Sequence, residues 1–240
     1  MLVLYDLDNK RKESWSPNTL KTRYAIAHKG LNKQDYELKW ISYPDVRELL
    51  QSKGVQAAEG TRVQQYTLPA IDHDDKTIMD SLKIAIYLDE TYPDTPRLLP
   101  EGQLPLYRAL QAYTATAVTA HVFPLLLPRV IDFLDPRGSE YFKRTREEVW
   151  GPISESINQD QAKVDECWSK ATAGLKLINQ MLEDNKGGPF VMGAQRTYSD
   201  LHLLSVIEWW KQSGDDIYSR GISIAPNLQK LYDACRDIRD

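Results

Sequence analysis

The hydrophobic and polar positions change their spacing along the chain, and this change separates an N-terminal part of mixed elements from a C-terminal part of helices. Residues 2–6 form a short apolar run, which predicts a buried strand. Residues 36–41 alternate between apolar and polar positions, which is typical of a half-buried strand. Between these strands, apolar residues recur at helical spacing from Pro17 until Gly30, which indicates a helix.

Further along, the N-terminal part contains a predicted hairpin. Two short apolar runs, 67–72 and 77–79, flank a polar turn. A short helix is expected at 44–50, and another runs from Asp80-Ser81 to a point before Pro93. The predicted order of elements is therefore β-α-β-α-β-β-α, ending near residue 92.

Everything after the proline-punctuated linker, 93–105, has a helical pattern. The long apolar segment 106–131 contains Pro124 and Pro128, so we expect a bent or split helix there. The charged amphipathic segment 140–150 is most simply a solvated face, or an edge of a dimer contact.

Two more helices in this part have apolar patterns that predict burial. An apolar stripe at three-four spacing runs from Val164 to Leu182, and residues 201–210 are apolar on most faces, as in a buried central helix. Mixed elements followed by helices predict the α+β class.

Composition narrows the possible partners. The chain has 240 residues with a net charge of −4, so no basic excess exists to bind nucleic acid. Its two cysteines, Cys167 and Cys235, fall on apolar stripes, where we expect them to be core residues; they are too few for a disulfide framework and make a metal site unlikely. We see no signal peptide and no apolar stretch near the roughly 20 residues of a membrane span, so we expect a cytoplasmic protein that does not bind membranes.

Four short motifs mark the starts of predicted elements. They are Ser16-Pro17 at the first helix, Leu68-Pro69 at the third strand, Asp80-Ser81 at the third helix, and Thr197 with Asp200 at the buried helix. Taken singly, each has an ordinary structural explanation: a helix cap whose side chain accepts from the backbone, a trans proline at a strand edge, or a capping box.

In this order and spacing, the motifs resemble those of the cytosolic glutathione transferases. The stretches WSPNTLKTRYAIAHKGL, YTLPAI, DSLKIAIYLDETYPD and TYSDLHLLS look closest to the fungal serine-containing classes, namely the fungal-specific A class and the etherase-like class, which resemble bacterial β-etherases. The resemblance covers the whole chain. It implies a thioredoxin-like, glutathione-binding domain over 1–92, a linker over 93–105 and an all-helical domain over 106–240.

The resemblance also implies a role for each N-terminal motif. Ser16 would hold the thiolate of glutathione, and a cis bond at Pro69 would turn the backbone of Leu68 toward the cysteinyl part of glutathione. Ser81 and the helix start would bind the γ-glutamyl carboxylate, and Asp80 would pair with the γ-glutamyl ammonium. Most members of the family have Glu or Gln where Asp80 stands, so its shorter reach departs from the pattern.

Physical chemistry explains why a serine at a helix start suits this role. A free thiol has a pKa of about 8.5, so little of it is thiolate at neutral pH, and each unit of pKa lowering corresponds to about 1.4 kcal/mol. A serine hydroxyl that donates a hydrogen bond supplies part of this energy, and the positive end of the helix supplies more. Ser16 has access to both.

The second substrate is expected in an apolar pocket formed by Trp15, Asn18, Tyr113 and His121. Burial in an interdomain core explains the aromatic residues equally well, and a lone histidine is a weak candidate for a base. Thr197 and Asp200 are assigned to structure, because a buried helix start needs its N–H groups satisfied.

The leading hypothesis is a glutathione transferase in which glutathione is the co-substrate, no metal takes part, and the thiolate attacks hydrophobic electrophiles or peroxides. The alternatives are a ligandin that binds aromatic polyphenols of plants or wood with little turnover, and a β-etherase-like enzyme that cleaves aryl ethers. A non-catalytic scaffold fits less well, because it has no need of Ser16, Pro69 and Ser81. By resemblance alone, the protein is expected to be a homodimer.

Overall fold

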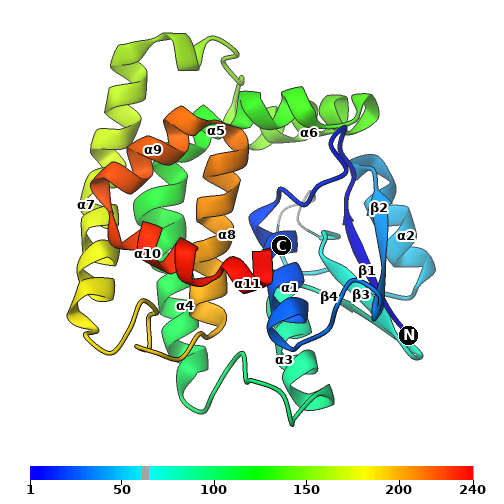
Figure 1. The fold of residues 1–240 in the computed structure, drawn as a ribbon. Helices are drawn as coiled ribbons and strands as arrows, with labels where there is room; N and C mark the ends of the chain where they lie inside the picture. The colour runs from blue at the N-terminus through cyan, green and yellow to red at the C-terminus, as the bar shows by residue number, and fades with distance from the viewer. Residues whose placement is uncertain (61–64, 240) are drawn as a thin grey trace. The chain divides into compact units, whose positions relative to one another are not determined.

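The structure is a computed structural model, and it describes residues 1–60 and 65–239. The chain packs into two compact units that interleave in the sequence (Figure 1). The first unit contains Met1–Arg97 and Ile131–Gly151, and the second contains Leu98–Val130 and Pro152–Asp240. Each unit is described separately below.

The first unit has the element order predicted from the sequence. Its elements in chain order are β1 (Leu2–Leu7), α1 (Pro17–His28), β2 (Tyr36–Ile41), the short 3-10 helix η1 (Tyr43–Asp45), α2 (Val46–Ser52), β3 (Ala70–His73), β4 (Lys76–Met79), α3 (Ser81–Thr91) and α6 (Pro136–Trp150). The β-α-β-α-β-β-α prediction is therefore confirmed, apart from η1 and α6.

The strands form one mixed sheet in the order β2-β1-β3-β4. β1 runs parallel to β2, and Leu4 lies opposite Leu38 in this pair. On its other side β1 runs antiparallel to β3, and Leu4 lies opposite Ile71. The hairpin β3–β4 completes the sheet. This is a thioredoxin-like arrangement, and together with the helices of the second unit it confirms the predicted α+β class.

Helices cover both faces of this sheet, with α1 and α3 on one side and α2 on the other (Figure 1). A buried ion pair joins the first two: the Nζ of Lys29, just after α1, lies 2.8 Å from the carboxylate of Asp89 on α3. Lys29 also donates to the carbonyl of Pro96 at 3.2 Å. These bonds hold the ends of α1 and α3, whose beginnings carry two of the predicted motifs.

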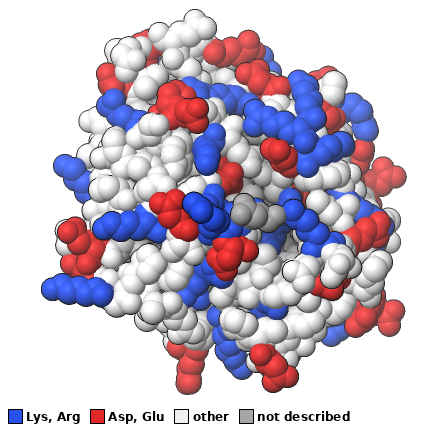
Figure 2. Space-filling view, viewed as in Figure 1, with Lys and Arg blue, Asp and Glu red and all other residues white. Residues whose placement is uncertain are grey.

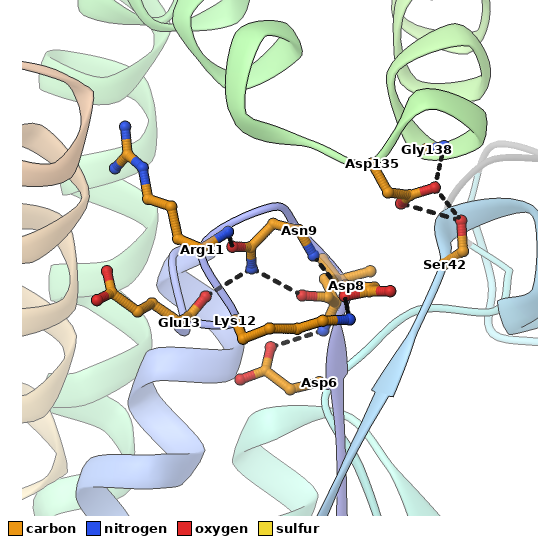
Figure 3. Close-up of polar contacts among 10 residues, drawn as sticks. Asp6, Asp8, Asn9, Arg11, Lys12, Glu13, Ser42, Asp135 and Gly138 are labelled. Atoms are coloured by element: carbon orange, nitrogen blue, oxygen red, sulfur yellow. Dashed lines mark hydrogen bonds and ion pairs between the residues drawn. The ribbon is translucent and has the colours of Figure 1, made fainter.

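The helix α6 is longer than the predicted segment 140–150 and packs with the first unit. Asp135 caps it by accepting a hydrogen bond from the N–H of Gly138 at 3.0 Å, and the same carboxylate accepts from Ser42 (Figure 3). The guanidinium group of Arg137 binds Asp45 of η1 at 2.6 Å. Much of residues 140–150 is exposed, as expected of a solvated face, but α6 is also attached to the η1 segment. The alternative, an edge of a dimer contact, stays a prediction.

The second unit is helical. Its elements are α4 (Gln103–Thr114), the π-helical turn η2 (Ala115–Thr119), α5 (Ala120–Phe133, of which residues 120–130 belong here), α7 (Gln161–Asp184) with the short 3-10 helix η3 (Ile157–Gln159) before it, α8 (Tyr198–Ser213), α9 (Asp215–Ile224), α10 (Asn227–Ala234) and α11 (Arg236–Arg239). Nearly every residue of α8 is buried, as the sequence predicted.

The expected break in the long helix occurs earlier than the prolines. Pro124 and Pro128 lie inside α5, whereas the irregular turn η2 ends at Thr119. A proline ring displaces the carbonyl four residues earlier, which for Pro124 is Ala120, so the change in hydrogen bonding falls in the preceding turn.

The long helix α7 packs closely on this turn. A Cβ atom added to Gly174 would lie 2.5 Å from the carbonyl oxygen of Ala117, so only glycine permits the approach. Cys235 is buried as expected, but Cys167 on α7 is partly exposed, which corrects its assignment to the core.

Among the described residues, the helical run Gln103–Phe133 is long and apolar enough to cross a membrane by length and composition alone. This differs from the expectation that no stretch approaches that length. Of the most apolar 18 residues in this run, 44% are buried. Core helices of soluble proteins meet the same criteria of length and composition, so the finding is weak evidence for a membrane span.

Candidate functional site

Ser16 is the N-cap residue of α1, and its hydroxyl group makes no hydrogen bond to any residue that the structure describes. Its carbonyl oxygen starts the helix instead, accepting from the N–H of Leu20 at 2.9 Å and from the hydroxyl of Thr19 at 3.1 Å. The prediction of a side-chain cap was therefore wrong. The hydroxyl is left for a ligand at the positive end of α1.

The loop that carries Ser16 is folded around Asn9 (Figure 3). The Nδ2 atom of Asn9 donates to the carbonyl of Glu13 at 2.6 Å and to that of Leu7 at 3.3 Å, and its Oδ1 atom accepts from the N–H of Arg11 at 3.0 Å. These bonds satisfy the backbone groups of the loop locally and so fix the path of the chain between β1 and Ser16.

Asp6, near the end of β1, is completely buried close to this loop. It accepts hydrogen bonds from the N–H of Leu7 at 2.7 Å and from the hydroxyl of Ser14. Arg23 on α1 donates to the same hydroxyl at 2.9 Å. Burial raises the pKa of Asp6, against the lowering effect of these donors. Sequence reasoning missed Asp6 and Asn9, although a carboxylate inside an apolar strand was a signal.

A cavity opens in the first unit between the start of α1, the η1–α2 segment, the loop 65–68 and α6. Ser16, Asn18 and Leu68 line it, so three residues singled out from the sequence surround one space. The other eight described lining residues were not predicted, among them Tyr43, Arg47, Tyr141 and Arg146.

The Leu68-Pro69 peptide bond is cis, as the resemblance implied. Leu68 precedes β3, and its backbone N–H and C=O enter none of the loop and turn hydrogen bonds found in the described part of the chain. The carbonyl of Pro69 accepts a hydrogen bond from the N–H of Asp80 at 3.3 Å. The second and third motifs are therefore in direct contact.

Asp80 is exposed and caps α3: its Oδ1 atom accepts from the N–H of Leu82 at 2.9 Å and of Lys83 at 3.0 Å. It adopts a φ of 92°, which is unusual for a residue with a side chain. Neither Oδ2 nor the hydroxyl of Ser81 appears in a hydrogen bond with the described residues. Two polar atoms therefore stand unengaged at the positive end of α3.

A buried lysine, Lys21 on α1, contributes to the electrostatics near Asp80. Burial lowers the pKa of Lys21 to about 8, and the charge of Asp80 opposes this lowering. A cation close to Asp80 reduces the net negative field there. The sequence analysis did not single out Lys21.

Aromatic rings and one guanidinium group form the α6 side of the cavity. Tyr43 and Tyr141 are stacked, with ring centroids 6.1 Å apart and planes at 18°. Arg146 lies over the ring of Phe142 at 4.5 Å and over that of Tyr43 at 5.5 Å. Burial raises the pKa of Tyr43, although the charge of Arg146 acts to lower it.

Trp15 packs behind this wall instead of lining the cavity. It is 4% exposed, and its ring meets those of Phe133 at 5.2 Å and Tyr43 at 6.3 Å. Tyr113 on α4 and His121 on α5 are half-buried and belong to the second unit, so they stay predictions for the substrate pocket.

The capping box of α8 is present, as predicted. Asp200 accepts hydrogen bonds from the N–H of Thr197 at 2.7 Å, from its hydroxyl at 3.0 Å, and from the N–H of Val191 at 2.6 Å. Burial raises the pKa of Asp200 to about 6, while these donors lower it. Within residues 1–60 and 65–239, no group of His, Cys, Asp and Glu suited to hold a metal ion occurs.

Comparison with known proteins agrees with this geometry. Residues 14–96 match the family model described as glutathione S-transferase, N-terminal domain, and residues 106–217 match the corresponding C-terminal domain. The chain is 38% identical to the glutathione S-transferase-like protein ustS of Aspergillus flavus over 210 residues, which are 82% of this chain and 74% of that protein. The chain belongs to the glutathione S-transferase family.

Solved structures of fungal glutathione transferases share the fold of this transferase over its whole length. GSTFuA3 from Phanerochaete chrysosporium is 32% identical, with a TM-score of 0.86 over 100% of this chain and 97% of its own. CsGST63524 of Ceriporiopsis subvermispora, solved in complex with glutathione, is 29% identical, with a TM-score of 0.89 over 100% and 98% of the two chains.

The candidate site contains residues from both matched segments. The N-terminal match includes Ser16, Leu68 and Asp80. The C-terminal match includes Tyr141 and Arg146, which lie on α6 and line the same cavity as Ser16 and Leu68.

Proposed function

We propose that this protein is a serine-type glutathione transferase in which Ser16 stabilises the glutathione thiolate. The observation that carries the proposal is a buried serine hydroxyl without a hydrogen bond to the described residues, at the start of α1 and on the wall of a cavity. A hydroxyl that donates to a thiolate lowers the pKa of the thiol, and the helix end adds to this effect.

Glutathione is proposed to bind along Leu68, Asp80 and Ser81. Its cysteinyl backbone pairs with the N–H and C=O of Leu68, as an added strand would. The hydroxyl of Ser81 and the N–H groups at the start of α3 bind the γ-glutamyl carboxylate, and Asp80 binds the ammonium. The hydrogen bond between Asp80 and Pro69 supports this arrangement, because it links the two places where the adjacent γ-glutamyl and cysteinyl parts of glutathione would lie.

The prepared thiolate then attacks a hydrophobic electrophile or a peroxide, in a cytoplasmic and homodimeric enzyme that functions in detoxification. The rate gain comes from preparing the anion and positioning the two reactants. Aryl-ether cleavage of the β-etherase kind uses the same thiolate, which then attacks the carbon of an aryl ether.

A ligandin role is the second candidate. The stacked rings of Tyr43 and Tyr141 beside the cavity favour the binding of aromatic compounds such as polyphenols, with or without turnover.

The test is glutathione conjugation by the wild type, Ser16→Ala and Ser16→Thr, measured with an isothiocyanate, a peroxide and a β-aryl ether, together with calorimetric binding of a polyphenol. Loss of a hydrogen bond to an anion predicts a fall in kcat/KM of about ten- to hundredfold for Ser16→Ala. Ser16→Thr keeps a hydroxyl and is expected to retain more activity. Equal activity of Ser16→Ala and the wild type would refute the serine mechanism, and a wild type that binds polyphenol without any turnover would establish the ligandin role instead.

A further inference from the structure

The cavity beside Ser16 has an uneven charge. Its described lining includes two arginines, Arg47 and Arg146, and no acidic residue. A cavity lined by one sign of charge with apolar walls attracts ligands of the opposite sign. Glutathione accounts for only part of this positive charge, because its γ-glutamyl end is proposed to bind at Asp80, which does not line the cavity.

Arg47 lies on the side of the cavity where glutathione is proposed to bind. It belongs to α2, donates to the side-chain oxygen of Gln65 at 3.2 Å, and lies over the ring of Tyr66 at 5.0 Å. These residues directly precede Leu68 in the chain. The glycyl carboxylate of glutathione, which follows the cysteinyl part, therefore has Arg47 as its nearest cation on this wall.

Arg146 lies on the other wall, which α6 provides. One of its nitrogens donates to the hydroxyl of Thr145 at 3.0 Å, and its guanidinium carbon lies over the rings of Phe142 and Tyr43. Among the described residues, no carboxylate lies within ion-pair distance of Arg146. A guanidinium group has five N–H donors, so this cation retains donors for a ligand.

The surface around α6 is basic as well. Figure 2 shows Lys and Arg side chains gathered over the region where Figure 1 places α6. This helix contributes Arg137, Lys143, Arg144 and Arg146 against Glu140, Glu147 and Glu148, so its side chains carry a net charge of +1. The field that an anionic substrate meets beside α6 is therefore weakly positive.

We propose that Arg146 makes this transferase selective for planar aromatic electrophiles that carry an anionic group, a carboxylate or a phenolate. The electrophile's ring packs on Tyr43 and Tyr141, and its anionic group pairs with Arg146. The inference rests on the proposed function, since it names the class of second substrate for the same thiolate.

Electrostatics explains why such a residue matters. A thiolate and an anionic electrophile repel each other, and the repulsion is strong in a cavity of low dielectric constant. A guanidinium group paired with the electrophile offsets this repulsion through charge-assisted hydrogen bonds. Without it, the anionic substrate is disfavoured at a site that otherwise accepts the neutral analogue.

The test compares a chloronitrobenzoate anion with its neutral methyl ester. In both reactions the thiolate forms a bond to the ring carbon that bears chlorine, and the carbon–chlorine bond breaks as chloride leaves with its electron pair. The two compounds differ in intrinsic reactivity, so the measured quantity is the ratio of their kcat/KM values in each variant relative to the wild type. That comparison cancels the intrinsic difference.

Arg146→Gln is expected to lower the anion-to-ester ratio by at least about tenfold, mainly through KM of the anion, because a charge-assisted hydrogen bond is lost. Arg146→Lys keeps the charge and restores part of the ratio. Arg220→Gln is the control: it removes the same charge from an exposed ion pair with Asp165, at a residue that does not line the cavity, and is expected to leave the ratio within about twofold of the wild type.

Two results would overturn the proposal. If Arg146→Gln raises KM for glutathione and affects both electrophiles equally, Arg146 serves the glycyl carboxylate. If it raises the pKa of the bound thiol and leaves the ratio unchanged, Arg146 serves the thiolate.

Binding measurements separate this proposal from the proposed function. Calorimetry with the benzoate anion and the ester requires no turnover. A wild type that binds the anion more tightly than the ester, and loses the preference in Arg146→Gln, supports the role of Arg146 even where conjugation fails; no preference in the wild type contradicts it.

Discussion

At the scale of the residue, we propose that Asp80 has two tasks at one position. One carboxylate oxygen caps α3, and the other is proposed to bind the ammonium of glutathione. An alanine would remove both the cap and the charge, so its effect on binding could not be separated from its effect on the helix.

Asp80→Asn separates them. An asparagine side chain still accepts the two backbone hydrogen bonds and tolerates the φ of 92°, but it has no charge. We predict that KM for glutathione rises about tenfold while kcat changes little, because a charge-assisted interaction in the bound state is lost. Steady-state kinetics with varied glutathione measures this, and an unchanged KM would remove Asp80 from the binding site.

At the scale of the element, the start of α8 depends on Asp200. The residue is completely buried and satisfies three donors from the backbone and from Thr197. A buried helix start without these bonds leaves N–H groups unpaired, so we propose that the box serves folding and not chemistry.

We predict that Asp200→Ala lowers the free energy of unfolding of the second unit by about 2–4 kcal/mol, while kcat/KM per folded molecule stays near that of the wild type. Denaturation followed by the fluorescence of the tryptophans measures the first quantity, and kinetics on the purified folded fraction measures the second. Asp165→Ala, at an exposed ion pair with Arg220, is the control and is expected to cost under about 1 kcal/mol. A large loss of activity with unchanged stability would contradict the structural assignment.

At the scale of the whole molecule, two buried charges shape the dependence of stability on pH. The pKa of Asp200 is raised from 3.8 to about 6, so the folded state binds this proton more tightly than the unfolded state. The resulting stabilisation is fully present below pH 4 and is lost as pH rises through 6. The pKa of Lys21 is lowered from 10.5 to about 8, so the folded state binds fewer protons between these values, and stability increases as pH rises through that window.

Lys21→Met tests the alkaline part. Lowering the pKa of Lys21 from 10.5 to about 8 corresponds to about 3 kcal/mol, which is the upper limit of the stability that an uncharged side chain adds at neutral pH. We predict a higher midpoint of denaturation at pH 7 for the variant and no alkaline rise in its stability. Identical pH profiles for variant and wild type would show that Lys21 titrates normally.

The sequence allowed the elements and their order to be predicted, because caps, prolines and periodicity act over a few residues. The resemblance placed Ser16, Leu68 and Asp80 in one site, and the structure brings the latter two into contact through Pro69. Local signals also led to errors; Pro124, for example, indicated a break that the structure places one turn earlier.

The α6 wall could not be predicted from the sequence, because it depends on contacts between distant segments. The hydrogen bond between Ser42 and Asp135 joins positions 93 residues apart, and no local sequence pattern predicts it. Arg146 looked like one charge among many on an amphipathic helix. Its stacking on Tyr43 becomes visible only after the helix has packed.

Ser16 is proposed to hold a thiolate, and the most direct test of this role is the pKa of the thiol in the enzyme–glutathione complex. Ultraviolet difference absorbance of the thiolate, titrated for the wild type and Ser16→Ala, gives this pKa without any electrophile. The serine mechanism predicts a pKa well below the value of about 8.5 for a free thiol in the wild type, and an increase of about one to two units in Ser16→Ala. The same pKa in both proteins would contradict it.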